Sequence, residues 1–216
     1  IAMKKSSPAR VLAALANAYP DARCGLSFES PLQLLVATIL SAQCTDVRVN
    51  RVTPGLFREF STAEAFAAAP QARIEKIVHS CGFFRQKAKS IRSCCRAIAE
   101  RHGGEVPRRL EDLVKLAGVG RKTANVVLNE AFGQPAIAVD THVLRTSNRL
   151  GWISTRDPVK AEFRIMETVP EKWWTRFTLL MIAHGRRCCT ARKPACPECP
   201  VLAHCSFGQE EINDRG

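Results

Sequence analysis

The segment at residues 116–124 reads LAGVGRKTA, and it predicts a tight turn between two helices. A short apolar helix is expected to end at Leu116, two glycines bracket Val119, and a second helix follows directly. Gly118 and Gly120 permit positive φ angles and allow another backbone to approach closely. The N–H groups that open the second helix lie at the positive end of its dipole, where anions bind. The segment is interpreted as a helix-hairpin-helix that holds a phosphate backbone, with an ordinary glycine-containing turn as the alternative.

The apolar residues of the remaining chain recur mostly at helical spacing, and no sustained alternation indicates a sheet. The pattern predicts an all-α fold. Residues 61–64 read as a capping box, and Asp157 followed by Pro158 reads as a helix start. Helices are expected, to within a few residues, at 9–18, 31–42, 45–53, 62–69, 72–79, 86–102, 110–116, 121–132, 141–150, 159–168 and 172–184.

The chain is strongly basic, with 32 Lys and Arg against 20 acidic residues in 216 and a formal charge of +12. This balance suits a polyanion, with nucleic acid as the first candidate and an anionic membrane surface as the alternative. Residues 85–109 hold eight Lys or Arg against two Glu, which indicates either phosphate contact or a solvated helix face. No apolar stretch approaches the ~18 residues of a membrane span. Residues 1–7 show no secretory signal, so a cytoplasmic protein is expected, nucleoid-associated if bacterial.

Four of the ten cysteines follow the order C-x6-C-x2-C-x5-C, at Cys189, Cys196, Cys199 and Cys205. Four thiolates in one short loop can hold a [4Fe-4S] cluster. Zinc is the competing interpretation, but structural zinc sites usually present two close ligand pairs, and only Cys196 and Cys199 form one here. The remaining six are expected to be small buried hydrophobes: Cys24, Cys44, Cys81, Cys94, Cys95 and Cys188.

From Leu32 to Cys205 the chain resembles the endonuclease III family. The resemblance rests on VGRKTANVVLN at 119–129, LSAQ at 40–43, Thr45 with Asp46, and AVDTH at 138–142. It implies a helix-hairpin-helix DNA glycosylase fold, in which two helical lobes flank a DNA-binding cleft. One lobe is expected to be a six-helix barrel at 24–134 that contains the hairpin, and the other a helical domain made of 1–23 and 135–216, with the cluster loop at 189–205.

The same resemblance implies a base excision repair enzyme, a bifunctional DNA N-glycosylase that removes oxidised pyrimidines and has AP lyase activity. Its partner is then double-stranded DNA with damaged bases or abasic sites, and a monomer is expected. The resemblance places the nucleophile at Lys122 and a catalytic aspartate at Asp140. Read from the residues alone, Lys122 could equally bind phosphate and Asp140 could cap a helix.

The chemistry of these two residue types fits the implied reaction. A lysine amine can attack the anomeric carbon, expel the base and form a Schiff base that permits β-elimination. The amine must be neutral to attack, and burial, nearby cations such as Arg121 or the helix N-terminus are expected to favour that form. Asp140 could stabilise positive charge that develops on the sugar, or help to move the amine proton.

An enzyme that acts on a base inside a duplex must flip the nucleotide out. By resemblance, Gln43 and Phe83 fill the gap, although Phe83 stands where the family usually has leucine and a core position is the alternative. Phe84 and Arg85 replace a Tyr-Asn pair, and Ala117 replaces a proline. The other residues expected to contact DNA are Gly118, Val119, Gly120, Arg121, Thr141, His142, Arg192 and Lys193.

Two other functions are compatible with parts of this pattern. A monofunctional glycosylase of the adenine-glycosylase branch would share the hairpin, the aspartate and the cluster, but it would lack Lys122. A non-catalytic DNA-binding module could use the hairpin and the cluster for docking alone. Borohydride trapping on abasic-site DNA separates a Schiff-base enzyme from both alternatives.

Overall fold

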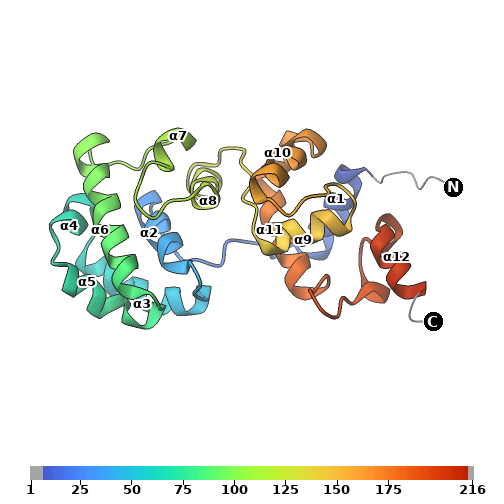
Figure 1. Cartoon of the computed structure of the whole chain (residues 1–216), viewed down its shortest axis with the longest axis horizontal. Coiled ribbons are helices and arrows are strands. Elements are labelled where there is room, and N and C mark those ends of the chain that lie inside the picture. Colours follow the sequence, from blue (N-terminus) through green and yellow to red (C-terminus); the bar gives the residue numbers. More distant parts are fainter. Residues whose placement is uncertain (1–6, 214–216) are drawn as a thin grey trace. The chain divides into compact units, whose positions relative to one another are not determined.

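The computed structural model describes residues 7–213, so the N-terminal residues 1–6, which carry most of the expectation about a secretory signal, lie outside it (Figure 1). Every regular element in this described range is a helix, and none of its residues form a strand. The all-α prediction is therefore confirmed. Within the same range, no helix has the length and apolarity needed to cross a membrane.

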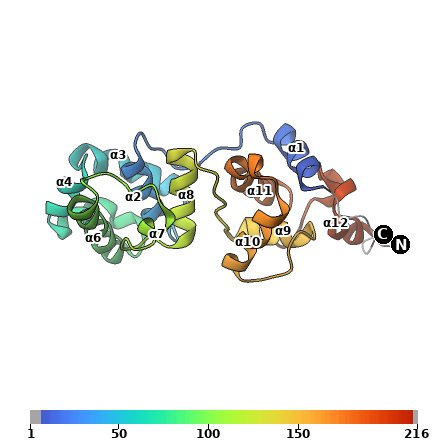
Figure 2. The ribbon, with the colours of Figure 1, turned by 90° about the horizontal axis from the view of Figure 1, so that it is seen from above.

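The chain divides into two compact units, Cys24–Gln134 and a second unit made of the chain up to Arg23 together with the chain from Pro135 onward. Figure 2 shows which helices belong to each. The first unit contains α2 (Pro31–Ser41), α3 (Asp46–Glu59), α4 (Ala63–Ala68), α5 (Gln71–Val78), η1 (His79–Cys81), α6 (Phe84–Arg101), α7 (Leu110–Leu113) and α8 (Arg121–Phe132). The second contains α1 (Pro8–Ala18), α9 (Thr141–Arg149), α10 (Pro158–Thr168), η2 (Glu171–Trp173), α11 (Trp174–Arg187), η3 (Cys196–Glu198), η4 (Leu202–His204) and α12 (Ser206–Asn213).

The core of the Cys24–Gln134 unit is organised around α2 and α6. Helix α2 is buried continuously from Leu34 to Leu40 and packs against α3, α6 and α8. Its Thr38 hydroxyl bonds to the Leu34 carbonyl at 2.7 Å, so this buried polar group is satisfied. Helix α6 buries an apolar stripe that includes Ile91 and Ile98 against α4 and α5. Three of the cysteines expected to be buried in this unit are buried, namely Cys81, Cys94 and Cys95, whereas Cys24 and Cys44 are half-buried.

The core of the second unit is formed mainly by α1, α9, α10 and α11. Helix α9 approaches α11 closely because Gly185 has no side chain. A Cβ at this position would lie 2.9 Å from Nδ1 of His142 and 3.1 Å from Nη2 of Arg145. Such contacts are too short for a side chain, so Gly185 fixes how closely the two helices pack.

Several element boundaries differ from the sequence-based expectation. Helix α3 continues through Pro54 to Glu59, although the predicted helix ended at 53. Burial of Thr53 and Leu56 on one face offsets the hydrogen bond that the proline removes. The predicted capping box is wrong in register, because Thr62 accepts the capping bond from the Ala65 N–H. Helix α12 was not predicted, and α7 is a single turn.

The two hairpin glycines have different backbone conformations. Gly118 has a φ of 77°, as expected, and a Cβ there would lie 2.9 Å from Cβ of Ser90 on α6. Gly120 has a φ of −86° and adjoins open space, so it does not use the positive φ that glycine permits. The fold therefore requires a glycine at 118 and does not require one at 120.

Gly118→Ala should destabilise the chain by about 1–3 kcal/mol, because it adds a strained left-handed alanine and a contact with Ser90. Gly120→Ala is the matched control, and its free energy of unfolding should stay within about 0.5 kcal/mol of the parent. Urea denaturation followed by circular dichroism measures both. Equal losses in the two variants would contradict this account of the hairpin.

Candidate DNA-binding and iron-sulfur sites

The hairpin leaves the start of α8 open on its outer side. The Val119 N–H bonds to the Leu116 carbonyl at 3.1 Å, and the Val119 side chain is buried. Gly120 is the N-cap of α8 and provides no side-chain capping bond. Lys122 is exposed in the first helical turn. The backbone of the hairpin and the Lys122 amine are therefore the groups that can meet a ligand here.

Gln43 and Phe83 share an unusual backbone conformation. Their φ values are 52° and 45°, and in the described range they are the non-glycine residues with positive φ. Both are exposed, and Phe83 has 69% of its surface accessible. The alternative that Phe83 is a core residue is therefore wrong. Strained backbone of this kind often marks a functional site.

These two side chains line one hollow of the Cys24–Gln134 unit together with the hairpin. Its volume is about 260 Å³, and Gly118 forms part of its wall. Residues from three separate loops thus lie around one depression: the end of α2, the start of α6 and the hairpin. An exposed aromatic ring beside a polar amide suits contact with nucleic-acid bases.

Lys87 is the functional residue that the sequence analysis missed, since it was counted among the basic residues of a surface segment. Its side chain is buried, with 5% exposed. The ammonium donates to the carbonyls of Leu40 at 2.8 Å and Cys81 at 2.6 Å, and burial lowers the pKa of Lys87. It joins the chain just before Gln43 to the chain just before Phe83. Its spacing of four from Ile91, on the apolar stripe of α6, is the signal that could have revealed it.

Asp140 begins α9 in the second unit. Its Oδ1 accepts the Val143 N–H at 2.8 Å, so the predicted N-cap is present. Thr141 is exposed, and His142 is half-buried with Nδ1 at 3.1 Å from Nη2 of Arg145. The cap fixes where the carboxylate of Asp140 lies relative to its own helix.

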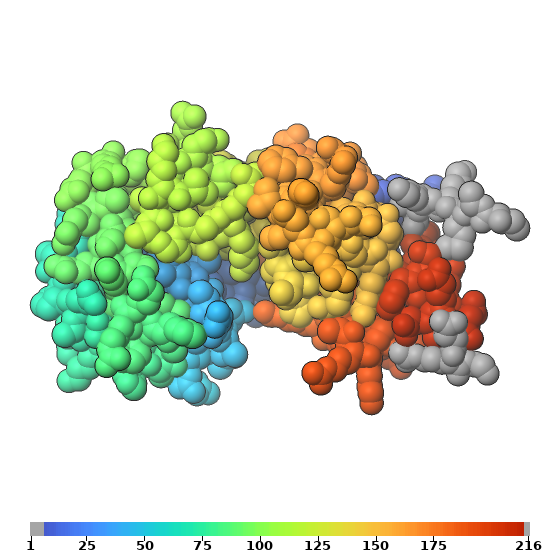
Figure 3. Space-filling model, in the orientation of Figure 1, coloured from blue at the N-terminus to red at the C-terminus, as the bar shows by residue number. Residues whose placement is uncertain are grey.

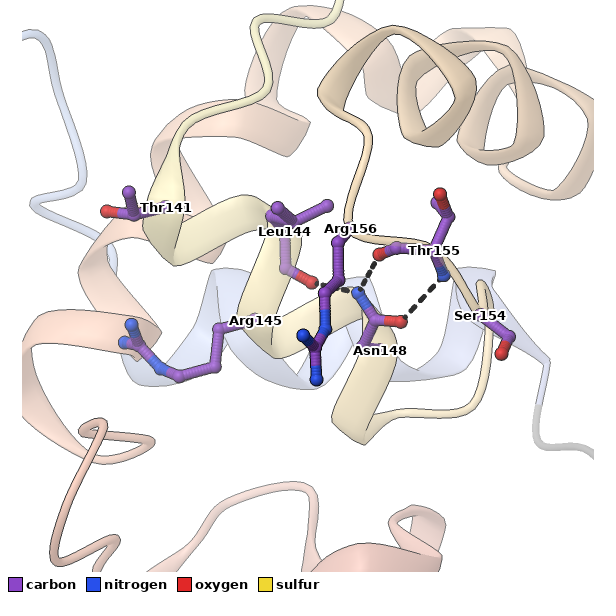
Figure 4. A pocket seen from close by; sticks show the side chains of 7 residues that line it. All are labelled: Thr141, Leu144, Arg145, Asn148, Ser154, Thr155 and Arg156. Carbon is purple, nitrogen blue, oxygen red and sulfur yellow. Dashed lines mark hydrogen bonds between the residues drawn. The ribbon is translucent and has the colours of Figure 1, made fainter.

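Thr141 also lines a basic hollow of about 530 Å³, shown in Figure 4. Arg145 and Arg156 both line it, but the Arg145 guanidinium points away from Arg156 and donates to the carbonyls of Gly185 and Cys189. Asn148 holds the segment at Thr155 against α9, because its amide donates to the Leu144 and Thr155 carbonyls at 2.7 and 2.9 Å. The Arg156 cation and the hydroxyl groups of this surface make it suitable for a phosphate backbone.

The four predicted ligand cysteines all line one small cavity of the second unit, at Cys189, Cys196, Cys199 and Cys205. The site fits an iron-sulfur cluster, because four thiols converge there and N–H donors face their sulfurs. Arg149 lies 3.3 Å from Sγ of Cys189, and the Gly208 N–H lies 3.4 Å from Sγ of Cys205. Such donors stabilise thiolate ligands. Burial raises the pKa of Cys199 and Cys205, so a bound metal must displace their protons.

Arginines of α9 hold the loop that contains these cysteines. Arg145 donates to the carbonyls of Gly185 and Cys189 at 2.9 and 3.0 Å. Arg149 donates to the carbonyls of Thr190 and Ala191 at 2.7 and 3.0 Å. Arg192 and Lys193 remain exposed on the loop. In Figure 3 the orange-red segment that leads from α11 into this loop projects from the surface of the second unit.

An all-α chain with a helix-hairpin-helix and a four-cysteine loop has the features of an iron-sulfur DNA repair protein. The HhH-GPD superfamily of base excision DNA repair proteins matches residues 36–171. The iron-sulfur binding domain of endonuclease III matches residues 189–205, the segment that begins at Cys189 and ends at Cys205.

The chain is similar over nearly its full length to several endonuclease III proteins. Endonuclease III of Synechocystis sp. is 50% identical over 210 residues, which cover 97% of this chain and 96% of the relative. Endonuclease III of Bacillus subtilis is 47% identical over 197 residues, covering 91% and 90%. The solved structure of a trapped endonuclease III–DNA covalent intermediate is 43% identical, with a TM-score of 0.88 and coverage of 94% and 96%. The chain belongs to the endonuclease III family.

The resemblance, the fold class and the enzyme class expected from the sequence are thereby confirmed. The protein is a base excision repair enzyme, a DNA glycosylase with AP lyase activity. Its cofactor is an iron-sulfur cluster of the [4Fe-4S] type, which decides against zinc.

Lys87→Met should lower the free energy of unfolding by about 2 kcal/mol, because two carbonyls lose a charged donor. It should also lower the excision rate, since the loops of Gln43 and Phe83 lose their shared anchor. Lys89→Met, an exposed lysine on the same helix, is the matched control. The measurements are urea denaturation and single-turnover excision. If Lys87→Met behaves like Lys89→Met in both assays, Lys87 has no anchoring role.

Proposed function

We propose that this enzyme removes oxidised pyrimidines from double-stranded DNA, with Lys122 as nucleophile and Asp140 as its catalytic partner. The observation that carries the proposal is the exposed Lys122 amine in the first turn of α8, directly after a hairpin that has no side-chain cap. The substrate class rests on the family resemblance. The similar endonuclease III trapped as a covalent intermediate with DNA supports a covalent route.

Lys122 attacks the anomeric carbon of the damaged nucleotide, and the base departs. The nitrogen loses a proton, the C1′–O4′ bond breaks with O4′ taking up a proton, and a Schiff base joins Lys122 to the opened sugar; loss of a C2′ proton then expels the 3′ phosphate by β-elimination. The Asp140 carboxylate stabilises positive charge on the sugar or accepts the amine proton. Its N-cap bond to Val143 holds the carboxylate in one orientation.

DNA binding in this proposal uses surfaces of both units. The backbone N–H groups that follow Gly118 and Gly120 bind phosphate, as does Arg121 beside them. In the other unit, Thr141 and His142 contact the strand near Asp140. The basic hollow that Thr141 shares with Arg145 and Arg156 supports this assignment. Arg192 and Lys193 add phosphate contacts from the cysteine loop.

Gln43 and Phe83 occupy the gap that the flipped nucleotide leaves. Their exposure and their place around one hollow support this role. An exposed Phe83 ring can stack on a base, which costs no core packing in the free protein.

The iron-sulfur cluster has a positioning role in this proposal. Cys189, Cys196, Cys199 and Cys205 hold it, and it fixes the loop that presents Arg192 and Lys193 to the DNA backbone. The enzyme acts as a monomer, because excision from one DNA duplex needs no second subunit. Its location in the cytoplasm, with the nucleoid, follows from its substrate.

Lys122→Gln should retain DNA binding but abolish strand cleavage and the complex trapped by borohydride on abasic-site DNA, because the amide cannot form a Schiff base. Gel-shift affinity and covalent trapping measure the two properties separately. Lys115→Gln, an exposed lysine that precedes the hairpin, is the control. Cleavage that survives in Lys122→Gln would remove this lysine from the mechanism and favour a different nucleophile.

Asp140→Asn should lower turnover by about 10²–10⁴-fold, because asparagine cannot supply the charge or accept the proton. Stability should change little, since asparagine caps helices as well as aspartate does. Asp140→Ala should lose turnover equally and, in addition, about 1 kcal/mol of stability. Thermal denaturation and single-turnover kinetics distinguish the effects. Normal turnover in Asp140→Asn would leave Asp140 with a purely structural role.

A further inference from the structure

Cys188 is a fifth thiol at the cysteine cavity. It lies immediately after α11, and its side chain is buried, with 8% exposed. The sequence pattern placed it among the space-filling cysteines because it falls outside the ligand spacing. The folded chain instead brings it to the wall of the cavity that the four ligand cysteines line.

The sulfur of Cys188 lies beside that of Cys199. The Sγ atoms of these two cysteines and a ring nitrogen of His184 all lie within 4.8 Å of one another. The Cys188 thiol donates to the Ala195 carbonyl at 3.5 Å, and Sγ of Cys199 lies 4.0 Å from Nε2 of His184. Cys94 and Cys95, which fill the core of the other unit, belong to no such group of metal-binding side chains among residues 7–213. Cys188 therefore differs from the space-filling cysteines, because its sulfur lies close to other atoms that can bind a metal.

The backbone holds Cys188 firmly at this position. The N–H groups of Cys188 and Cys189 both bond to the His184 carbonyl at 2.9 Å. The Cys188 carbonyl accepts the Ala195 N–H at 3.0 Å, across the loop. These bonds fix the thiol before any metal binds, which lowers the entropic cost of using it as a ligand.

A separate zinc site made of His184, Cys188 and Cys199 is the other arrangement that this geometry permits. It would compete with the iron-sulfur cluster for Cys199, which belongs to the segment matched by the cluster-binding domain. The imidazole is also held from its other side, because Nδ1 of His184 lies 3.1 Å from the Tyr19 hydroxyl. One thiol can occupy only one of the two sites, and the family's cluster takes precedence.

We propose that Cys188 is a reserve ligand, whose thiol takes over the position of Cys199 at the cluster when the Cys199 side chain is lost. The ligand set then becomes Cys188, Cys189, Cys196 and Cys205. In this exchange the S–H bond of Cys188 breaks, its proton passes to solvent, and the sulfur lone pair forms a bond to iron. No electron is transferred. The inference rests on the ligand set assigned under the proposed function.

The test uses alanine variants of the full chain, because alanine offers no oxygen ligand in place of sulfur. The readouts are iron and acid-labile sulfide per chain, absorbance near 400 nm, and the electron paramagnetic resonance signal after reduction. Cys188→Ala should keep the full cluster content. Cys199→Ala should keep more than half of it with an altered resonance signal, and Cys188→Ala combined with Cys199→Ala should lose at least five-fold.

Cys205→Ala is the matched control, since the close group formed by His184, Cys188 and Cys199 does not include Cys205. It should lose the cluster on its own. A cluster retained in Cys205→Ala would overturn the proposed ligand set. If Cys205→Ala and Cys199→Ala lose it equally, only the reserve role of Cys188 is wrong.

Folding is monitored by circular dichroism, and each variant is also reconstituted anaerobically with iron and sulfide. A Cys199→Ala chain that takes up no cluster under these conditions, folded or not, contradicts the proposal. A double variant that keeps as much cluster as Cys199→Ala also contradicts it. Stoichiometric zinc in the parent chain, lost in Cys188→Ala, would establish the competing zinc site instead.

Discussion

The buried ammonium group of Lys87 holds together two irregular segments of the Cys24–Gln134 unit, the turns at Gln43 and Phe83. The exposed side chains around the hairpin depend on these two turns. Burying a charged amine is costly unless hydrogen bonds replace its water. Lys87 meets this condition with the carbonyls of Leu40 and Cys81, one at the end of α2 and the other just before α6. Neither carbonyl could be satisfied by a continuing helix, because the chain turns at both places. The cation thus permits two tight turns, at Gln43 and Phe83, to lie side by side.

The second unit uses the same device with arginine. The chain between α11 and η3 has little regular structure, so its carbonyls lack helical partners. Arg145 and Arg149, one turn apart on α9, donate to three of them, and Arg145 also donates to the Gly185 carbonyl in the last turn of α11. The planar guanidinium suits this task because several N–H groups point in fixed directions. Part of the chain's positive charge therefore stabilises loops, and only the remaining exposed cations are available to a polyanion.

The sequence was sufficient for the all-α class and for most helix positions, because helical spacing of apolar residues and caps such as Asp157 are local signals. It was sufficient for the four-cysteine loop because ligand spacing is also local. It failed where long-range packing decides. Burial of Leu56 carries α3 past Pro54, and the contacts of Lys87 and Cys188 join segments that only the folded chain brings together. Exposure of Phe83 was likewise undecidable, since an apolar residue suits a core equally well.

The contrast between the two hairpin glycines separates what the fold needs from what a partner needs. Gly118 is explained within the chain, by its positive φ and by the contact with Ser90. Gly120 has no such internal reason, because its φ is ordinary and nothing lies near it. A residue with a side chain would fit there in the free protein, and it would cover the uncapped start of α8. The same reasoning applies to Phe83, which is 69% exposed in its unit. The fold tolerates Gly120 and Phe83 but does not need them, and both lie near the hairpin. Contact with a DNA phosphate backbone and with stacked bases gives these two residues a reason that packing within the chain does not.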